Sequence, residues 1–166
     1  MFITCGRGTR VYKDSKKEDF VMAITVKKIT LWRKEVAHEA GMLADVLEPL
    51  AEAGVNLRLV MGYAIPGEPS RAAIEVFPIT GKKLIGAATT AGLAASQIAC
   101  LLVEGDDRAG LGADMGRAVT NAGVNISFLM AEAFGRKFSA VFGFQNDGDA
   151  ATASKAIKSA AKPRKK

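Results

Sequence analysis

The amino-acid sequence predicts an α+β protein built from two copies of one small unit. Three observations support this prediction. A stretch of the chain repeats itself at a fixed distance, the apolar residues follow strand and helix periods in the same order twice, and 166 residues are enough for two small cores. Hydrophobic residues make up 49% and charged residues 24% of the chain, which is typical of a soluble globular protein.

The internal repeat appears when the chain is shifted against itself by 69 residues. Residues 38–61 (HEAGMLADVLEPLAEAGVNLRLVM) then align with residues 107–130 (DRAGLGADMGRAVTNAGVNISFLM), and nine of 24 positions are identical. The tetrapeptide AGVN stands at the same place in both copies. Repetition of this kind indicates two copies of one supersecondary unit.

Each copy begins with a strand and a helix. The β-rich stretches 27–36 and 98–105 are the predicted first strands. In the helices that follow, apolar residues recur at helical spacing, and each series ends at a glycine suited to a helix C-terminus, Gly54 or Gly123. Pro49 removes a backbone donor inside the first of these helices, at a cost of about 3 kcal/mol in a regular interior, so we expect a kink or an early end there.

Two more strands and a second helix follow in each copy. The second strands are predicted at 55–63 and 124–134, and the second helices at 81–95 and 147–161. The third strands alternate strictly, and their residues on one face are Ala72, Ile74 and Val76 in the first copy and Phe138, Ala140 and Phe142 in the second. This predicts antiparallel sheets with helices on one face. The order is that of ferredoxin-like (βαββαβ) units in tandem, although the second copy ends before a fourth strand.

The unit boundaries follow from the repeat and the charge distribution. We place the first unit at residues 22–96 and the second at 97–161, between an N-terminal extension (1–21) and a basic tail (162–166). The extension is expected to be either disordered or a non-native addition to the protein. These two ends account for the net charge of +6, because residues 21–161 carry 14 basic and 14 acidic side chains. We interpret the ends as solvated rather than as phosphate-binding segments.

Several classes of protein are disfavoured. Residues 84–103 are uncharged and long enough to span a bilayer, but Ala, Gly and Thr fill their first half, so we expect no membrane association. Two cysteines, Cys5 and Cys100, make no disulfide framework, and an apolar secretion signal is missing, which favours the cytoplasm. His38 is the only histidine, and neither metal-ligand spacing nor a nucleophile with a base is evident; we therefore predict no enzyme activity, metal site or cofactor.

Two nucleotide-binding functions are also disfavoured by the sequence. GLGADMG, residues 110–116, misses the spacing of a dinucleotide-binding loop. An RNA-recognition module shares the order of elements, and RKFSAVFGF puts aromatic and basic residues on one strand. The corresponding strand of the first copy carries aliphatic residues, so these phenylalanines are better explained as core, and we expect no nucleic-acid partner. Cys100 is likewise expected to be buried and inert.

Both copies contain the same pattern: a strand, a polar loop that ends in glycine, a helix and then AGVN. This pattern resembles the ACT domain, a small amino-acid-binding regulatory module. The resemblance covers residues 27–161. The family usually has Asp or Asn, any residue, Pro and Gly before the first helix; here Ala40 and Ala109 replace the proline, while Gly41 and Gly110 remain. The resemblance implies a tandem ACT protein without an attached catalytic domain, with a ligand held between units.

The resemblance also implies which residues touch the ligand: the loop before the first helix and the start of the second strand. These residues are His38, Glu39, Ala40, Gly41, Asn56, Asp107, Arg108, Ala109, Gly110 and Asn125. A helix N-terminus offers donors to a carboxylate, Asp107 offers acceptors to an ammonium, and an asparagine offers both. The alternative is that Asn56 and Asn125 only turn the chain after glycine. If they are ligand residues, we expect them at a junction shared by the two units.

Two functional hypotheses follow. The first is a non-enzymatic regulatory or sensor protein that binds a small amino acid or related metabolite and changes its assembly or partner contacts in response. The second is a regulatory subunit or interaction scaffold for an amino-acid biosynthetic enzyme, with no ligand of its own. Exposed sheet edges on small ferredoxin-like units favour a homodimer in either case.

Overall fold

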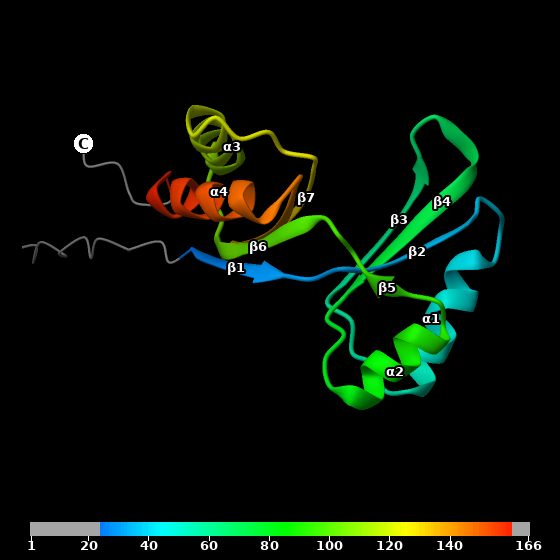
Figure 1. Ribbon diagram of the computed structural model, residues 1–166. Helices are drawn as coiled ribbons and strands as arrows, with labels where there is room; N and C mark the ends of the chain where they lie inside the picture. Colours follow the sequence, from blue (N-terminus) through cyan, green and yellow to red (C-terminus); the bar gives the residue numbers. More distant parts are fainter. Residues whose placement is uncertain (1–23, 161–166) are drawn as a thin grey trace, which may run out of the picture.

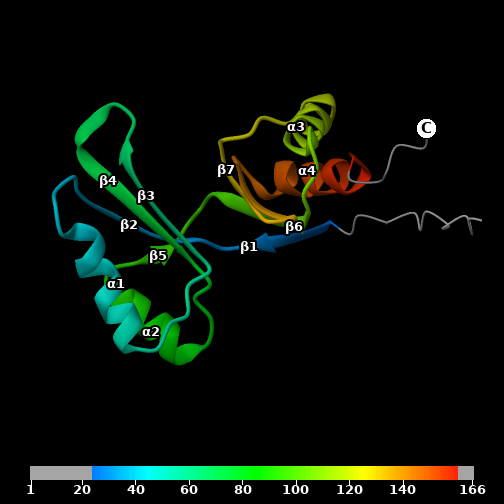
Figure 2. The same ribbon diagram turned by 180° about the vertical axis from the view of Figure 1, so that it is seen from behind.

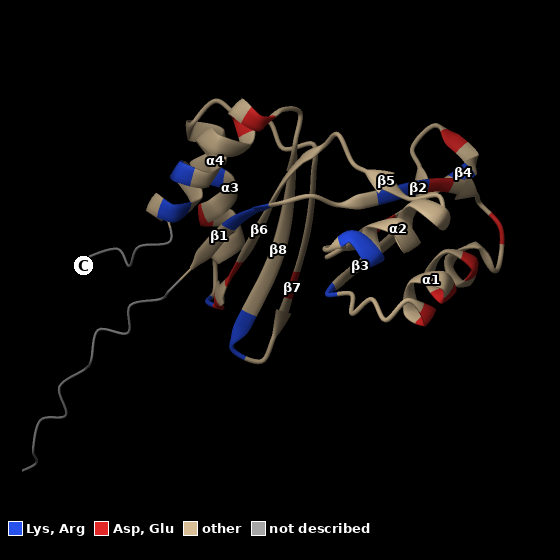
Figure 3. Cartoon of the chain, turned by 60° about the horizontal axis from the view of Figure 1, so that its bottom comes forward, with Lys and Arg blue, Asp and Glu red and all other residues tan. Residues whose placement is uncertain are grey.

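The computed structural model describes residues 24–160, which form two four-stranded antiparallel sheets, each with a pair of helices (Figure 1). The predicted N-terminal extension and the basic tail lie outside the described residues. The predicted fold class, α+β with two ferredoxin-like ACT-type units in tandem, is confirmed. Within the described residues, basic and acidic side chains are interspersed over both units instead of forming a single basic face (Figure 3).

Unit 1 is a complete βαββαβ motif. Its elements are β2 (Trp32–Ala37), α1 (Met42–Glu52), β3 (Leu59–Ile65), β4 (Glu68–Phe77), α2 (Lys82–Thr90) and β5 (Ala94–Ala95). The strands lie in the order β3-β4-β2-β5. The closing strand β5 is only two residues long and pairs with the beginning of β2.

Unit 2 repeats this arrangement but closes its sheet differently. Its elements are β6 (Ala99–Asp106), α3 (Leu111–Asn121), β7 (Phe128–Phe134), β8 (Lys137–Phe144) and α4 (Asp147–Ala160), together with β1 (Thr25–Ile29). The strands lie in the order β1-β6-β8-β7. Strand β1 pairs antiparallel with β6 along five residues, so the first described strand of the chain supplies the fourth strand of the second sheet.

The sequence prediction of one strand over residues 27–36 is wrong. The stretch divides into β1 and β2, which belong to different sheets. Leu31, between them, is fully buried where the two units meet. The β-rich composition continues across the break, and only long-range packing divides it.

The helices also depart from two expectations. Pro49 does not end α1, which continues to Glu52 because Val46 and Leu50 anchor it in the core on either side of the proline. The predicted helix over residues 81–95 ends at Thr90, and Gly92, with φ of 81°, turns the chain into β5. The uncharged stretch 84–103 is thus divided among α2, β5 and β6. Among the described residues, no helix has the length and apolar character needed to span a membrane.

A separate core lies under each helix pair. The core of unit 1 is aliphatic and includes Val46, Leu50 and Val76. The core of unit 2 contains Phe138, Phe142 and Phe144, which confirms their assignment to the core and leaves no exposed stacking platform on this strand for RNA.

The two sheets pack against each other through the faces that carry no helices, and the helix pairs lie on opposite sides of the molecule (Figure 2). This junction contains Ile29, Leu31, Cys100, Leu102 and Val141, with partly buried side chains from both units around them: Leu59, Met61, Phe77, Ile98, Phe128 and Met130. In strands β6 and β8, junction residues alternate with residues that face the helices, as a two-residue period requires. The Phe128 ring lies directly over Gly143, where an added Cβ would come within 2.1 Å of it.

Candidate ligand site

The loop between β2 and α1 is held against the β3–β4 hairpin. The His38 backbone N–H donates to the Ser70 carbonyl at 2.9 Å, and the His38 imidazole Nδ1 lies 3.2 Å from the Pro69 carbonyl oxygen. Gly41 then adopts a φ of 97°, a left-handed conformation that glycine permits and other residues rarely adopt. Helix α1 begins there without a side-chain cap, which leaves first-turn N–H groups available to an anionic ligand group.

The loop between β6 and α3 has the same construction in unit 2. The Asp107 N–H donates to the Arg136 carbonyl at 2.8 Å, and Gly110 adopts a φ of 80° before α3 begins, again without a side-chain cap. Arg108 pairs with Asp114 at 2.5 Å and ties this loop to the first turn of the helix. The two copies of the repeat therefore present their first helices in the same way.

A crevice lies beside each loop. The unit 1 crevice has a volume of about 290 Å³ and the unit 2 crevice about 250 Å³. Their lining residues coincide under the repeat of 69 positions: His38, Met42, Leu43, Gly62, Tyr63 and Ala64 in unit 1 correspond to Asp107, Leu111, Gly112, Ala131, Glu132 and Ala133 in unit 2. Duplication has thus preserved a concave site at the start of the first helix.

The two crevices differ in chemistry. The unit 1 crevice has His38 and Glu39 at its loop. The unit 2 crevice has Asp107 at its loop and an apolar floor that includes Met115 and Phe138, and the Glu132 side chain on its wall points with Met130 to the opposite, helix-free face of β7. The two crevices are therefore not expected to prefer the same ligand.

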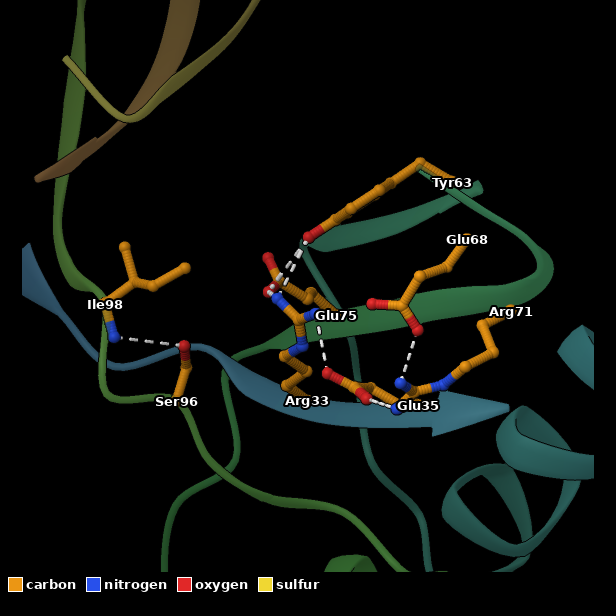
Figure 4. Close-up of polar contacts among 8 residues, drawn as sticks. All are labelled: Arg33, Glu35, Tyr63, Glu68, Arg71, Glu75, Ser96 and Ile98. Carbon is orange, nitrogen blue, oxygen red and sulfur yellow. Dashed lines mark hydrogen bonds and ion pairs between the residues drawn. The ribbon is translucent and has the colours of Figure 1, made fainter. Parts of the chain in front are cut away.

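A polar network covers part of the helix-free face of unit 1 (Figure 4). The Arg33 guanidinium and the Tyr63 hydroxyl each donate to Glu75 Oε1 at 3.3 Å, and Arg33 also pairs with Glu35 at 2.9 Å. Arg71 extends the network by pairing with Glu35 and, at 2.5 Å, with Glu68.

Glu75 is the fully buried member of this network. Its Oε2 atom has no hydrogen-bond partner among the described residues. Burial raises the pKa of Glu75 above its ordinary value, against the opposing effects of Arg33 and Tyr63.

Burial likewise raises the pKa of Tyr63, and it raises the pKa of Cys100 to about 12, with a smaller contribution from Glu75. Cys100 is therefore a buried, protonated thiol, as the sequence predicted.

Comparison with known proteins identifies the fold. No protein-family model matches the chain, and a search of curated proteins finds no match. Among solved structures, protein BT0572 from Bacteroides thetaiotaomicron superimposes with a TM-score of 0.65 at 16% identity, over 80% of this chain and 90% of that chain. The regulatory subunit of aspartate kinase from Thermus thermophilus, in its ligand-free form, superimposes with a TM-score of 0.56 at 21% identity, over 84% of this chain and 98% of that chain.

This chain has the tandem ACT-type fold. E. coli aspartokinase III, solved in complex with aspartate and ADP, adds a further match with a TM-score of 0.53 at 14% identity, over 83% of this chain and 33% of that chain. The similarity to the Thermus structure is to a regulatory subunit rather than to a catalytic one.

The ACT-type resemblance also named residues, and the structure brings only some of them together. His38 and Glu39 line the unit 1 crevice, and Asp107 lines the unit 2 crevice. Ala40 and Gly41, and Arg108, Ala109 and Gly110, lie in the same two loops. Asn56 and Asn125 are exposed and follow the far ends of the 11-residue helices, roughly 16 Å from the loops of their own units. The strands that follow them send Leu59 and Phe128 into the junction.

Sequence reasoning missed two lining positions, Tyr63 and Glu132. Both residues lie in the second strand of their unit. The alternation of apolar and polar residues predicts which face of the sheet such a residue occupies, but it does not predict which loop lies next to the strand. Their separation of 69 residues was a usable signal, because it makes them the same position of the repeat.

Proposed function

We propose that this chain is a regulatory protein whose two ACT-type units bind a small amino acid or a related metabolite in the crevices beside α1 and α3. The observation that carries the proposal is the recurrence of one crevice at equivalent positions, each beside an uncapped helix N-terminus. A concave site with a few convergent polar groups is the usual form of a small-molecule site.

The chemistry of a zwitterion suits both crevices. Its carboxylate would accept hydrogen bonds from first-turn N–H groups near Gly41 or Gly110, where the helix dipole also favours a negative charge. Its ammonium would donate to Glu39 in unit 1 or to Asp107 in unit 2. In this proposal Asn56 and Asn125 contribute to a ligand only from a neighbouring unit or a second copy of the chain.

A homodimer is part of the proposal. The outer strands β3 and β7 expose apolar side chains at equivalent positions, Val60 at 41% and Leu129 at 51%. Pairing of such edges between copies would cover both side chains and their free backbone groups. A ligand held across that contact would stabilise it by RT ln(1 + [L]/Kd), about 2.7 kcal/mol at a hundredfold excess over Kd.

The protein is proposed to act in the cytoplasm without catalysis of its own and without a cofactor. A second candidate function is a regulatory subunit or scaffold for an amino-acid biosynthetic enzyme, with no ligand. The similarity to the regulatory subunit of an aspartate kinase favours an enzyme partner under either candidate.

A thermal-shift screen of the full chain against the twenty amino acids separates the two candidates. We expect a saturable rise in Tm with one or a few amino acids, and loss of that rise when Gly41→Val or Gly110→Val distorts the corresponding loop. The matched control is Gly86→Ala, a helical glycine with open space around its Cβ position and no part in either crevice. Uniform absence of a shift, together with a stably co-purifying enzyme, would favour the scaffold.

A further inference from the structure

A third crevice lies between the two units, on the helix-free side of both sheets. Its volume is about 280 Å³. Unit 1 contributes Arg58, Leu59 and Phe77 to its wall, and strands β6, β7 and β8 of unit 2 contribute the rest. It is distinct from the crevices beside α1 and α3, because those lie next to the helix N-termini.

The floor of this junction crevice is apolar and the rim is charged. Leu102 and Val141 are buried beneath it, and Met130 is partly buried beside them. The charged lining residues are Arg58, Glu104 and Glu132. A small molecule with an apolar body and a charged group matches this combination.

The charges on the rim do not cancel. Arg58 and Glu104 form an ion pair at 2.5 Å and neutralise each other. Glu132 makes no hydrogen bond or ion pair with any residue of the described chain, and Ser139 places a hydroxyl in the same wall. The lining therefore carries one unpaired negative charge. Lys27, on the same sheet face and opposite Leu102, forms no ion pair with either carboxylate in the described chain.

The helix-free face of unit 1 carries different residues at the positions equivalent to Glu132, Val141 and Leu102. The register of the sheets makes Tyr63, Glu75 and Arg33 the counterparts of Glu132, Val141 and Leu102. In unit 1 the cation and the carboxylate pair with each other, since Arg33 and Tyr63 both donate to Glu75 Oε1. In unit 2 the Glu132 carboxylate lies above an apolar floor. The position that corresponds to Arg33 is Leu102, which offers Glu132 no positive charge.

We propose that the junction crevice binds a small organic cation, an ammonium group carried on an apolar body. The ammonium donates to Glu132 and to the Ser139 hydroxyl, while the apolar body covers Met130, Leu102 and Phe77. Because both units line the crevice, the bound cation holds them together. The Glu132 carboxylate faces the junction crevice together with Ser139, and the charged side chain of the unit 2 crevice is Asp107, so the two sites use different charged groups.

The test uses butylammonium as the probe, with butyrate and butanol as matched controls of the same apolar body. The full chain is titrated at pH 7 and constant ionic strength, and methyl chemical shifts of Met130, Leu102 and Leu59 are followed by NMR. We expect saturable shifts with butylammonium only. Loss of the charge–charge contact in Glu132→Gln should weaken binding about tenfold. The Glu48→Gln variant, in an exposed position of α1 outside the three crevices described above, should bind as the parent does.

A second pair of variants locates the cation. Ser139→Ala should weaken binding, whereas Asp107→Asn, which changes only the unit 2 crevice, should not. The proposal is overturned if butyrate or butanol binds as well as butylammonium, if Glu132→Gln binds like the parent, or if the shifts appear at Leu111 and Gly112 and respond to Asp107→Asn. The probe is not an amino acid, so failure of this test leaves the proposal for the α1 and α3 crevices standing.

Discussion

The two units share one strand order but close their sheets in different ways. Unit 1 ends on β5, a strand of two residues that follows α2 in the chain. Unit 2 borrows β1, which pairs along five residues and lies far from α4 in the sequence. The comparison shows that a duplicated sequence need not produce two independent folding units, because the second sheet depends on residues that precede the first.

The helix-free faces differ as well. Unit 1 carries Arg33, Tyr63 and the buried Glu75, whereas unit 2 carries Leu102, the unpaired Glu132 and Val141 at the same positions, in that order. An ionic network with one unsatisfied buried oxygen adds little to stability, because the desolvation of buried charges offsets their attraction. Apolar side chains from both units therefore supply most of the junction's stability, and the buried Glu75 of unit 1 makes the stability of the protein depend on pH.

The largest effect is expected from separating unit 2 from β1. A fragment of residues 97–160 should not fold, because strand β6 would lose its outer partner and expose the core residues that Ile24 and Val26 cover. The matched control is a permuted fragment in which a short Gly/Ser linker joins residue 160 to residues 24–30, since α4 lies against β1. Circular dichroism and amide NMR dispersion should report folding of the permuted form only. A cooperatively folded 97–160 fragment would contradict the dependence on β1.

The next largest effect compares the two cores at one equivalent position. Phe142→Ala should lower the free energy of unfolding by about 3 to 5 kcal/mol, because it leaves a large cavity under α3 and α4. Val76→Ala, at the corresponding position of unit 1, should cost about 2 kcal/mol. Urea denaturation measures both. Equal costs would contradict the expectation that the larger side chain of Phe142 contributes more buried apolar area to its core than Val76 does.

A smaller effect is expected at the glycine beneath Phe128. Gly143→Ala should cost about 1 to 3 kcal/mol, because the new Cβ would overlap the ring and force it out of the junction. Phe128→Leu in the same chain should recover part of the loss by removing the overlapping ring. Urea denaturation of the single and double variants measures the coupling, and additive losses would contradict the contact.

The smallest effect is a pH dependence from Glu75. Since burial raises its pKa, the folded protein binds this proton more tightly than the unfolded chain does, and its contribution to the free energy of unfolding rises as pH falls from 7 toward the ordinary value of 4.5. Relative to Glu75→Gln, the wild-type chain should therefore gain stability over that range. Urea midpoints at a series of pH values check this, and parallel pH profiles for the two proteins would refute it.

The sequence predicted the repeated elements well because their signals are local. Apolar spacing located the first helices, and Gly54 and Gly123, both with positive φ, follow their ends. The division between β1 and β2 was not predictable in the same way. Residues 27–36 read as one β-rich run, and only the remote partner of β1 at residues 100–104 separates it from β2.

In the candidate site, too, the residues with local sequence signals were predictable and those placed by long-range packing were not. The loops containing His38 and Asp107 could be found from a helix start and a preceding polar stretch. Tyr63 and Glu132 could not be found that way, because they reach the crevices from neighbouring strands. Asn56 and Asn125 could be predicted as turn positions after a glycine. Their distance from the loops depends on the observed length of the first helix of each unit, so it could not be predicted from the sequence pattern.

Amino-acid binding at the two helix starts is tested most directly by an amide NMR titration of the full chain with each of the twenty amino acids. We expect saturable shifts for at least one of them, concentrated at the first-turn amides Met42 and Leu43 or Leu111 and Gly112, beside the two crevices. Absence of shifts at both helix starts with every amino acid would contradict it.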